Sequence, residues 1–229
     1  MIDSLISSQA WEVPNSRMVV NLKKMRESSW GMNGNQPKIY YFAGVSMRSS
    51  SSNEVGYTYF NERGEDEYNA FENLMVKIDK AADLILNLID KCSGVNVSDV
   101  PVVKAVGWEN FPPKDDDFAI KCFSSLSRMV SLKEKKQSDV ELFIRRREDR
   151  GVSHYAYVEI GGEVVFKAKP AYEKKDTITN LLNAVVGAGA LLEKFQGMAW
   201  NVMIDSRNPD YDVTSSYGNR GIMLVKATK

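Results

Sequence analysis

The chain has 229 residues, of which 43% are hydrophobic and 26% are charged, and its 30 Lys and Arg residues balance its 30 Asp and Glu residues. This composition is ordinary for a folded globular protein and excludes a disordered chain, which would have fewer apolar residues. No stretch approaches the roughly 18 consecutive apolar residues of a membrane-spanning helix, and the first residues lack the features of a signal peptide, so we expect a cytoplasmic protein.

The neutral net charge conceals an uneven distribution of charge along the chain. Residues 1–117 contain 12 Lys and Arg against 17 Asp and Glu, whereas residues 118–197 contain 14 against 10. A chain of this kind can carry a basic surface without being basic overall. A polyanionic partner is therefore compatible with the composition.

The first predicted elements are an N-terminal arm and three strands. The arm covers residues 1–16, and we expect its Trp11 to dock on a neighbouring subunit. Beyond the arm, alternating or β-rich runs predict strands at residues 17–24, 38–47 and 54–61. The segments between these strands are rich in Gly, Asn and Ser, which is typical of loops.

A long helix is predicted to follow these strands. Apolar residues recur at three- and four-residue spacing from Phe71 to Ile89, which gives the segment one apolar face. Asp66 is placed to cap the first turn, because a short side-chain oxygen accepts a hydrogen bond from an unpaired backbone amide. Gly94 is predicted to end the helix in the left-handed conformation, with Lys91 in the last turn.

A polar connector closes the first module, which extends over residues 17–117. It follows a weak strand at residues 100–107 and holds three consecutive acids, Asp115, Asp116 and Asp117. Three acids in a row suggest a magnesium site, but in a proline-rich connector they are more often a solvated linker. We expect no metal at this place.

The second module, residues 118–204, repeats the order of strands followed by a helix. Its strands are predicted at residues 118–132, 138–147, 152–160 and 163–169. The pair Gly161 and Gly162 predicts a two-residue hairpin turn between the last two strands, and residues 133–137 predict a polar loop.

The second long helix matches the first when the chain is slid along itself by 103 residues. The sequence LIDKCSG at residues 88–94 then falls on LLEKFQG at residues 191–197. We predict that this helix begins with Asp176 or Thr177 as the N-cap and ends at Gly197, in the same way as the first helix ends at its glycine.

Two further features complete the second half of the chain. Gly187 and Gly189 lie within the helix, where close packing against another helix explains them better than phosphate binding does. Weak strands are predicted after the helix at residues 198–204 and 220–227, the second of them within a C-terminal segment of residues 205–229.

These elements predict an α+β fold built from two pseudo-symmetric modules, each an antiparallel sheet with one helix. One helix covers only one face of a sheet, so we expect the two modules to pack helix against helix as one compact domain. The outer faces of the sheets would then be available to a ligand, since antiparallel sheets tolerate one solvated face.

Aromatic residues on the predicted strands and loops are candidates for base stacking. Exposed rings on a sheet stack on the bases of single strands, and this contributes about 1 to 3 kcal/mol per base. Alternatively, these tyrosines are the half-buried residues common in any strand, and Trp30 anchors its loop on the core. The aromatic candidates are Tyr40, Tyr57, Tyr59, Tyr155, Tyr157 and Trp30.

Lysines and arginines form clusters that are candidates for phosphate contacts. Three consecutive arginines end a predicted strand, where they would neutralise phosphates and make binding depend on salt. Alternatively, they form a solvated hairpin tip that Glu148 and Asp149 compensate in part. The basic candidates are Arg145, Arg146, Arg147, Arg150, Lys133, Lys135, Lys136, Lys167, Lys169, Lys23 and Lys24.

Residue types suited to catalysis or metal binding are scarce. Cys92 and Cys122 do not form a CxxC motif, and His154 is the single histidine, so neither a zinc site nor a disulfide framework is predicted. The glycine-rich motifs that bind nucleotides are absent as well. We therefore expect no enzymatic activity, no cofactor and no bound metal.

The two modules and the matched segments LIDKCSG and LLEKFQG resemble the Whirly-type fold over about residues 17–204. This family includes plant proteins that bind single-stranded DNA, mitochondrial proteins that bind guide RNA, and an RNA-binding protein associated with the nucleus of jumbo phages. The resemblance implies binding of single strands along sheet edges by a homo-oligomer. It rests on the order of elements, because the lysine-glycine-lysine-alanine run of the plant proteins is absent, and no binding residue is carried over from it. A bacteriophage origin would place the protein in the host cytoplasm or at the phage replication compartment.

The sequence thus predicts non-catalytic binding of single-stranded nucleic acid, with RNA, such as mRNA, favoured over DNA. The alternative is a structural or assembly protein, for example of a virus, that binds protein partners through the same sheets. The salt dependence of nucleic-acid affinity separates the two, since phosphate contacts release counterions.

Overall fold

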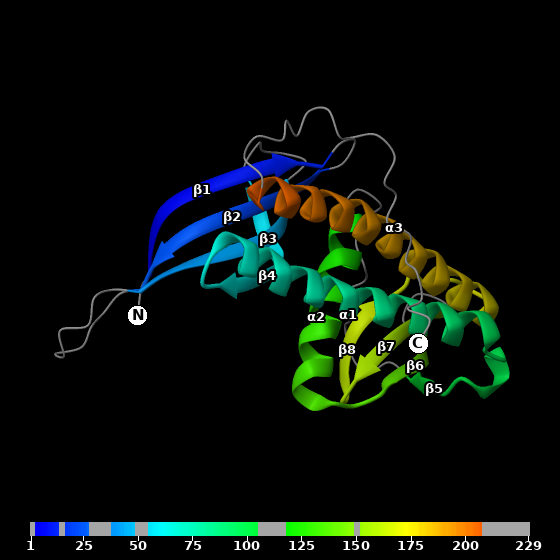
Figure 1. The fold of residues 1–229 in the computed structure, drawn as a ribbon. Coiled ribbons are helices and arrows are strands. Elements are labelled where there is room, and N and C mark those ends of the chain that lie inside the picture. Colours follow the sequence, from blue (N-terminus) through cyan, green and yellow to red (C-terminus); the bar gives the residue numbers. More distant parts are fainter. Residues whose placement is uncertain are drawn as a thin grey trace. The chain divides into compact units, whose positions relative to one another are not determined.

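The computed structural model describes residues 3–13, 17–27, 38–48, 55–104, 118–148 and 152–207 (Figure 1). This part of the chain is α+β, as predicted, with two four-stranded sheets and three α-helices. None of its helices is long and apolar enough to cross a membrane. The chain divides into two compact units, Met1–Asp79 with Leu192–Lys229, and Lys80–Leu191. The boundaries between these units fall within both long helices.

The first unit contains an antiparallel sheet whose strands follow one another in sequence order. The strands are β1 (Ser4–Glu12), β2 (Met18–Arg26), β3 (Ile39–Arg48) and β4 (Val55–Gly64). The last three confirm the predicted strands, whereas β1 lies where an arm was predicted. β1 pairs with β2, and the Trp11 ring makes an edge contact with Phe71 of the same unit at 6.3 Å between ring centroids. Trp11 is half-buried, and its expected docking on a neighbouring subunit stays a prediction.

Helix α1 (Glu67–Gly94) follows this sheet, as predicted. Asp66 caps its first turn, because the Asn69 amide donates a hydrogen bond to Asp66 Oδ1 at 2.7 Å. The helix buries the apolar side chains that recur at helical spacing, including Phe71, Leu74, Ile78, Ile85 and Leu88. It ends at Gly94, also as predicted, but this residue has no positive φ, so the left-handed ending is wrong.

The second unit contains a sheet in the order β5-β6-β7-β8. Its strands are β5 (Val102–Lys104), β6 (Val140–Arg147), β7 (Ser153–Ile160) and β8 (Glu163–Lys167). β5 follows the short 3-10 helix η1 (Val97–Asp99) and runs parallel to β6, while the other pairs are antiparallel. Gly161 and Gly162 have φ values of 56° and 76°, which confirms the predicted hairpin turn, because this turn needs positive φ at both positions.

Residues 118–132 belong to a helix and do not form the predicted strand. Helix α2 (Phe118–Lys136) buries three apolar residues at helical spacing, Leu126, Met129 and Val130. Serines lie before, between and after these residues, at positions 124, 125, 127 and 131. Helix α2 packs against β8 and β7. Gln137, with a φ of 49°, ends the helix by donating its backbone N–H to the Lys133 carbonyl at 2.9 Å.

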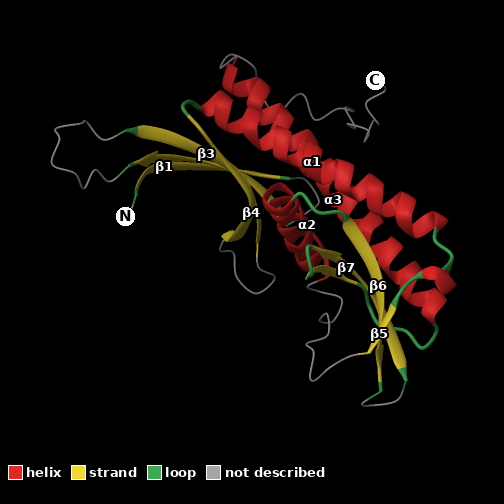
Figure 2. Ribbon diagram, turned by 90° about the horizontal axis from the view of Figure 1, so that it is seen from below, coloured by secondary structure: helices red, strands yellow, loops and turns green. Residues whose placement is uncertain are grey.

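Helix α3 (Lys174–Arg207) extends beyond the predicted helix at both ends (Figure 2). The Thr177 hydroxyl donates to the Lys174 carbonyl at 2.7 Å, so Asp176 and Thr177 lie in the first turn and are not N-caps. Gly197 lies inside the helix and does not end it, and the strand predicted at residues 198–204 is wrong. The reason is that buried residues continue at helical spacing, through Phe195, Met198, Ala199 and Val202. The strand predicted at residues 220–227 lies outside the described residues.

Gly187 occupies an exposed position in the middle of α3. A Cβ atom added to it meets nothing within 4 Å, so the prediction of close packing is wrong for Gly187. Gly189, by contrast, is buried, and for it close packing stays a prediction. A glycine in a helix interior is less favourable than alanine, since its backbone loses more conformational freedom on folding.

We expect Gly187→Ala to raise the free energy of unfolding by about 0.5 to 1 kcal/mol, because the new methyl group contacts solvent and fits the helix. Urea unfolding followed by circular dichroism measures this change. A loss of stability would contradict the open surroundings of Gly187.

Candidate functional site

Eight Lys and Arg side chains belong to one end of the second sheet, which we name the basic strand end. β5 runs parallel to β6. β7 runs antiparallel to β6, and β8 runs antiparallel to β7, so β8 has the same direction as β6. The C-terminal ends of β5, β6 and β8 therefore lie at the same end of the sheet. The segment that leads into α3 also reaches this side, where Ala171 pairs with His154 at the start of β7. The members are Lys104, Arg145, Arg146, Arg147, Lys167, Lys169, Lys174 and Lys175.

The strand register sets the spacing of this cluster. Lys104 lies opposite Arg146, and Lys167 lies opposite Tyr157 on the other edge of β7. Because adjacent strands are about 4.8 Å apart, the cations on β5, β6 and β8 span about 14 Å across the strand ends. The fold thus unites two predicted groups that are twenty residues apart in sequence, the three arginines and the lysines at 167 and 169.

Few acids oppose these cations in the described part of the basic strand end. Glu148 pairs with Arg146 at 3.1 Å and with Lys104 at 3.7 Å, and Glu173 and Asp176 flank the two lysines of α3. The Glu148 pairs are exposed, with side-chain accessibilities of 45% to 77%. Exposed ion pairs of this kind contribute about 0 to 1 kcal/mol, so a phosphate can replace the carboxylate at little loss.

Tyr155 and Tyr157 do not form the exposed platform that we predicted. They retain only 4% and 1% of their accessible surface, because each ring is covered by its neighbours. Phe143 stacks on Tyr157 with 5.5 Å between ring centroids, and the Arg145 guanidinium lies 4.9 Å from the centre of the Tyr157 ring. Tyr155 and Tyr157 are therefore core residues, and Arg145 is partly committed to covering them.

Tyr40 is likewise buried, with 2% of its surface accessible, so it is not an exposed ring as predicted. The Arg63 guanidinium lies 3.7 Å from the centre of its ring, and its hydroxyl donates a hydrogen bond to Asp3 Oδ2. Burial, followed by the hydrogen bond to Asp3, raises the pKa of the Tyr40 hydroxyl above its ordinary value. This tyrosine joins β3 to the segment that precedes β1.

Of the remaining aromatic and arginine candidates, the structure describes the side chain of Tyr59 alone. Tyr59 is half-buried on β4. The side chain of Tyr57, and all of Trp30 and Arg150, lie outside the described residues.

Lys23 and Lys24 belong to the first unit and point to opposite faces of its sheet. Successive residues of a strand alternate between faces, and the Lys24 ammonium lies 5.5 Å from the centre of the Tyr41 ring on its own face. Both lysines are half-buried. They do not form the single basic group that their adjacency in sequence suggested.

The lysines at the end of α2 lie at the opposite end of the second sheet and serve mainly as structural contacts. Lys133 Nζ donates to the Ser138 carbonyl at 2.6 Å. Lys136 Nζ contacts Glu163 Oε1 at 2.6 Å, and Arg128 reaches the other carboxylate oxygen at 3.1 Å. These contacts hold α2 against the β7–β8 hairpin, and Lys135 alone of the three predicted lysines is exposed without a described ion pair.

Sequence analysis missed Tyr172, the most exposed large hydrophobic residue among those described. Its side chain retains 82% of its accessible surface, and it stands among Lys169, Lys174 and Lys175. The signal in the sequence was an aromatic residue within a lysine-rich turn.

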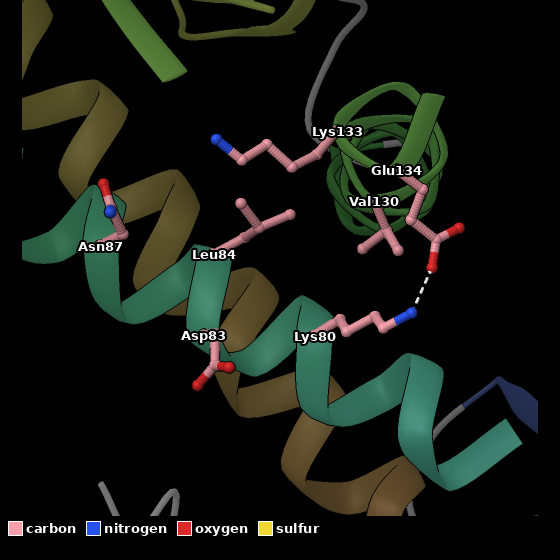
Figure 3. A pocket seen from close by; sticks show the side chains of 7 residues that line it. All are labelled: Lys80, Asp83, Leu84, Asn87, Val130, Lys133 and Glu134. Carbon is pink, nitrogen blue, oxygen red and sulfur yellow. Dashed lines mark hydrogen bonds and ion pairs between the residues drawn. The ribbon is translucent and has the colours of Figure 1, made fainter. Parts of the chain in front are cut away.

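A groove of about 390 Å³ lies between α1 and α2 in the second unit (Figure 3). Leu84 and Val130 face each other across it, and the Lys80 ammonium pairs with Glu134 at 2.6 Å along one side. The lining is largely apolar, and its two lysines already bind oxygen atoms of the chain. It contains no arrangement suited to acid-base or nucleophilic chemistry.

The described residues also contain no group of three or more His, Cys, Asp and Glu residues placed to hold a metal. Cys92 is a buried thiol, and its burial raises its pKa to about 11. A thiol of this kind stays protonated at neutral pH and is a weak nucleophile. The basic strand end with Tyr172 is therefore the best-defined candidate site of the described chain.

Comparisons of the chain with protein families, with curated proteins and with solved structures found no match.

Glu163 provides a test of the contacts at the far end of the second sheet. Hydrogen bonds from Lys136 and Arg128 lower the pKa of its carboxyl group below the ordinary value. A carboxylate with a lowered pKa stabilises the fold above the pKa of the unfolded chain, about 4.3, and loses this effect as the pH falls through the folded-state value.

We expect Glu163→Gln to unfold at lower urea concentration than the wild type at about pH 7, and the difference to shrink on acidification below about pH 4. Glu72→Gln, which changes an exposed carboxylate on α1, serves as the control and should leave the midpoint nearly unchanged. A difference for Glu163→Gln that persists at acid pH would contradict this account.

Proposed function

We propose that the chain binds single-stranded nucleic acid without catalysing a reaction, RNA ahead of DNA, and that the basic strand end contacts the phosphates. The observation that carries this proposal is the convergence of eight cations from β5, β6, β8, α3 and the segment before it on one end of a sheet, with three acids among the described residues there. Rows of Lys and Arg of this kind are the usual electrostatic feature of nucleic-acid binding.

The arrangement of the cations supports a strand that crosses the sheet at its end. Lys104 and Arg146 lie opposite each other on β5 and β6, and Arg146 in turn lies opposite His154 of β7. Lys167 of β8 lies opposite Tyr157, three residues further along β7, so the cations spread both across and along the strand ends. The width of about 14 Å across these strands has room for more than one phosphate of a flexible strand. The contacts are to the backbone, which makes binding tolerant of base sequence.

The resemblance to the Whirly-type fold supports the same class of ligand. It does so through the order of sheet and long helix, which occurs in both halves of the chain. Helix α2 and the parallel strand β5 depart from the predicted order. The choice of RNA over DNA rests on the resemblance alone, so the experiment includes both.

The test compares two lysines that stand at opposite ends of the second sheet. Lys175 lies in the first turn of α3 at the basic strand end, and Lys135 lies in the last turn of α2; both are exposed. Fluorescence anisotropy of labelled single-stranded RNA, single-stranded DNA and duplex DNA, each at several salt concentrations, gives the affinity and its salt dependence.

We expect the affinity of the wild type for single strands to fall steeply with salt, and Lys175→Ala to reduce the slope by about 0.7, the value for one phosphate contact on a single strand. Lys135→Ala should leave the slope unchanged. If the two substitutions had equal effects on the slope, the basic strand end would not be the binding site. If the wild type bound no nucleic acid, the proposed function would be refuted.

A second candidate function, assembly with a protein partner, is favoured by the exposed edge strand β1. Every residue from Ser4 to Ala10 is exposed, including Leu5 and Ile6 at 56% and 42%, and β1 is the last strand of its sheet among the described residues. An edge of this length with a single charge, Glu12, is open to pairing with a strand of another chain.

If β1 mediates assembly, Ser8→Lys should lower the molecular mass measured by light scattering, because a charge at the centre of an edge strand opposes pairing. Ser124→Lys, on the exposed surface of α2, is the control and should leave the mass unchanged. A wild type that is monomeric at all concentrations would exclude self-assembly through this edge.

A further inference from the structure

The exposed ring of Tyr172 adds a second kind of contact to the basic strand end. Resting on the proposed function, we infer that Tyr172 stacks on an unpaired base and that it makes this site prefer single strands over duplexes. The cations alone do not supply this preference, since phosphates are present in both forms of nucleic acid.

The backbone around Tyr172 is fixed by hydrogen bonds to regular elements. The His154 amide donates to the Ala171 carbonyl at 2.7 Å, and the Ala171 amide donates to the His154 carbonyl at 2.8 Å. His154 Nδ1 lies 2.8 Å from the Tyr172 carbonyl oxygen, and Asn180 Nδ2 of α3 donates to the Lys169 carbonyl at 3.0 Å. The segment that carries the ring is therefore held by β7 on one side and by α3 on the other.

The combination of a fixed backbone and an exposed ring distinguishes Tyr172 from an ordinary surface residue. Isolated exposed apolar side chains are common and need no function. Tyr172, by contrast, exposes 82% of its surface from a segment with four described hydrogen bonds, next to β7, whose Tyr155 and Tyr157 are buried. A ring presented in this way binds a base with little loss of conformational freedom.

The position of the ring relative to the cations suits a nucleotide. Lys169 precedes Tyr172 by three residues, and Lys174 and Lys175 follow it in the first turn of α3. Arg146 lies opposite His154, the residue that pairs with Ala171 beside the tyrosine. A base on the ring thus places its neighbouring phosphates within the basic strand end.

The physical difference between single and double strands then follows from stacking. An unpaired base offers a free face to an aromatic ring, whereas the bases of a duplex are already stacked and paired. Removal of one stacking ring weakens single-strand binding by about 5- to 150-fold in comparable sites. Its removal should leave duplex binding, which uses phosphates alone, nearly unchanged.

The experiment compares Tyr172→Ala with Tyr172→Phe, which retains the ring and serves as the matched control. Anisotropy titrations use a labelled single-stranded RNA and a duplex of the same length, at a salt concentration where the wild type binds both. We expect Tyr172→Ala to weaken single-strand binding by at least about 5-fold with duplex affinity and salt slope retained, and Tyr172→Phe to resemble the wild type.

Photocrosslinking provides a measurement that does not depend on a substitution. An RNA containing 5-iodouridine, irradiated in complex with the wild type, should crosslink to Tyr172, as identified by mass spectrometry of the peptide.

The outcomes separate the inference from the function on which it rests. If the wild type binds no nucleic acid, the proposed function is wrong and the inference falls with it. If the wild type binds single strands and Tyr172→Ala binds them equally well, the function stands and the stacking role is refuted. Equal losses of single-strand and duplex affinity would also refute it, because the ring would then not discriminate between them.

Discussion

The pairing of strand β7 with its neighbours is the interaction on which the second unit depends. β7 pairs with β6 on one edge, and with β8 and then Ala171 on the other, so three segments take their register from it. Its residues from His154 to Val158 are buried. Because a shift of one residue would turn every side chain to the opposite face, this burial fixes the register firmly. The positions of Arg146, Lys167 and Tyr172 are consequences of that register.

Sequence periodicity predicted which residues share a face but not which faces are covered. The prediction placed Tyr155 and Tyr157 on one face of their strand, and the register pairs them with Arg145 and Phe143 on that face. The sequence of a strand alternates with a period of two residues whether one face contacts solvent or is covered by guanidinium groups and other rings. Whether a tyrosine is core or platform therefore depends on tertiary packing, which a single sequence does not contain. Seven of the eight described strands and both long helices lie in segments predicted from the sequence. All of these except the short β5 have patterns that extend over many residues.

The errors in the prediction of helices have a common physical origin. A glycine after a lysine suggested that α3 ends at Gly197, yet the burial of Phe195, Met198 and Val202 on one face outweighs the modest preference of glycine for helix ends. In the same way, Leu126, Met129 and Val130 make residues 118–136 helical although the segment is rich in serine. In both places local propensity was overridden by an apolar face that packs on the rest of its unit.

The two lysines in the first turn of α3 have a consequence for the thermodynamics of that helix. Lys174 and Lys175 stand at the positive end of the helix dipole, where a cation is unfavourable, and Asp176 is the only acid in that turn. An anion bound beside them would compensate both the lysines and the unpaired amides of the helix end. Binding of an anion at the basic strand end would then stabilise the first turn of α3, and a more stable first turn would in return raise the affinity for the anion. A negatively charged ligand would thus strengthen a helix end that two lysines weaken.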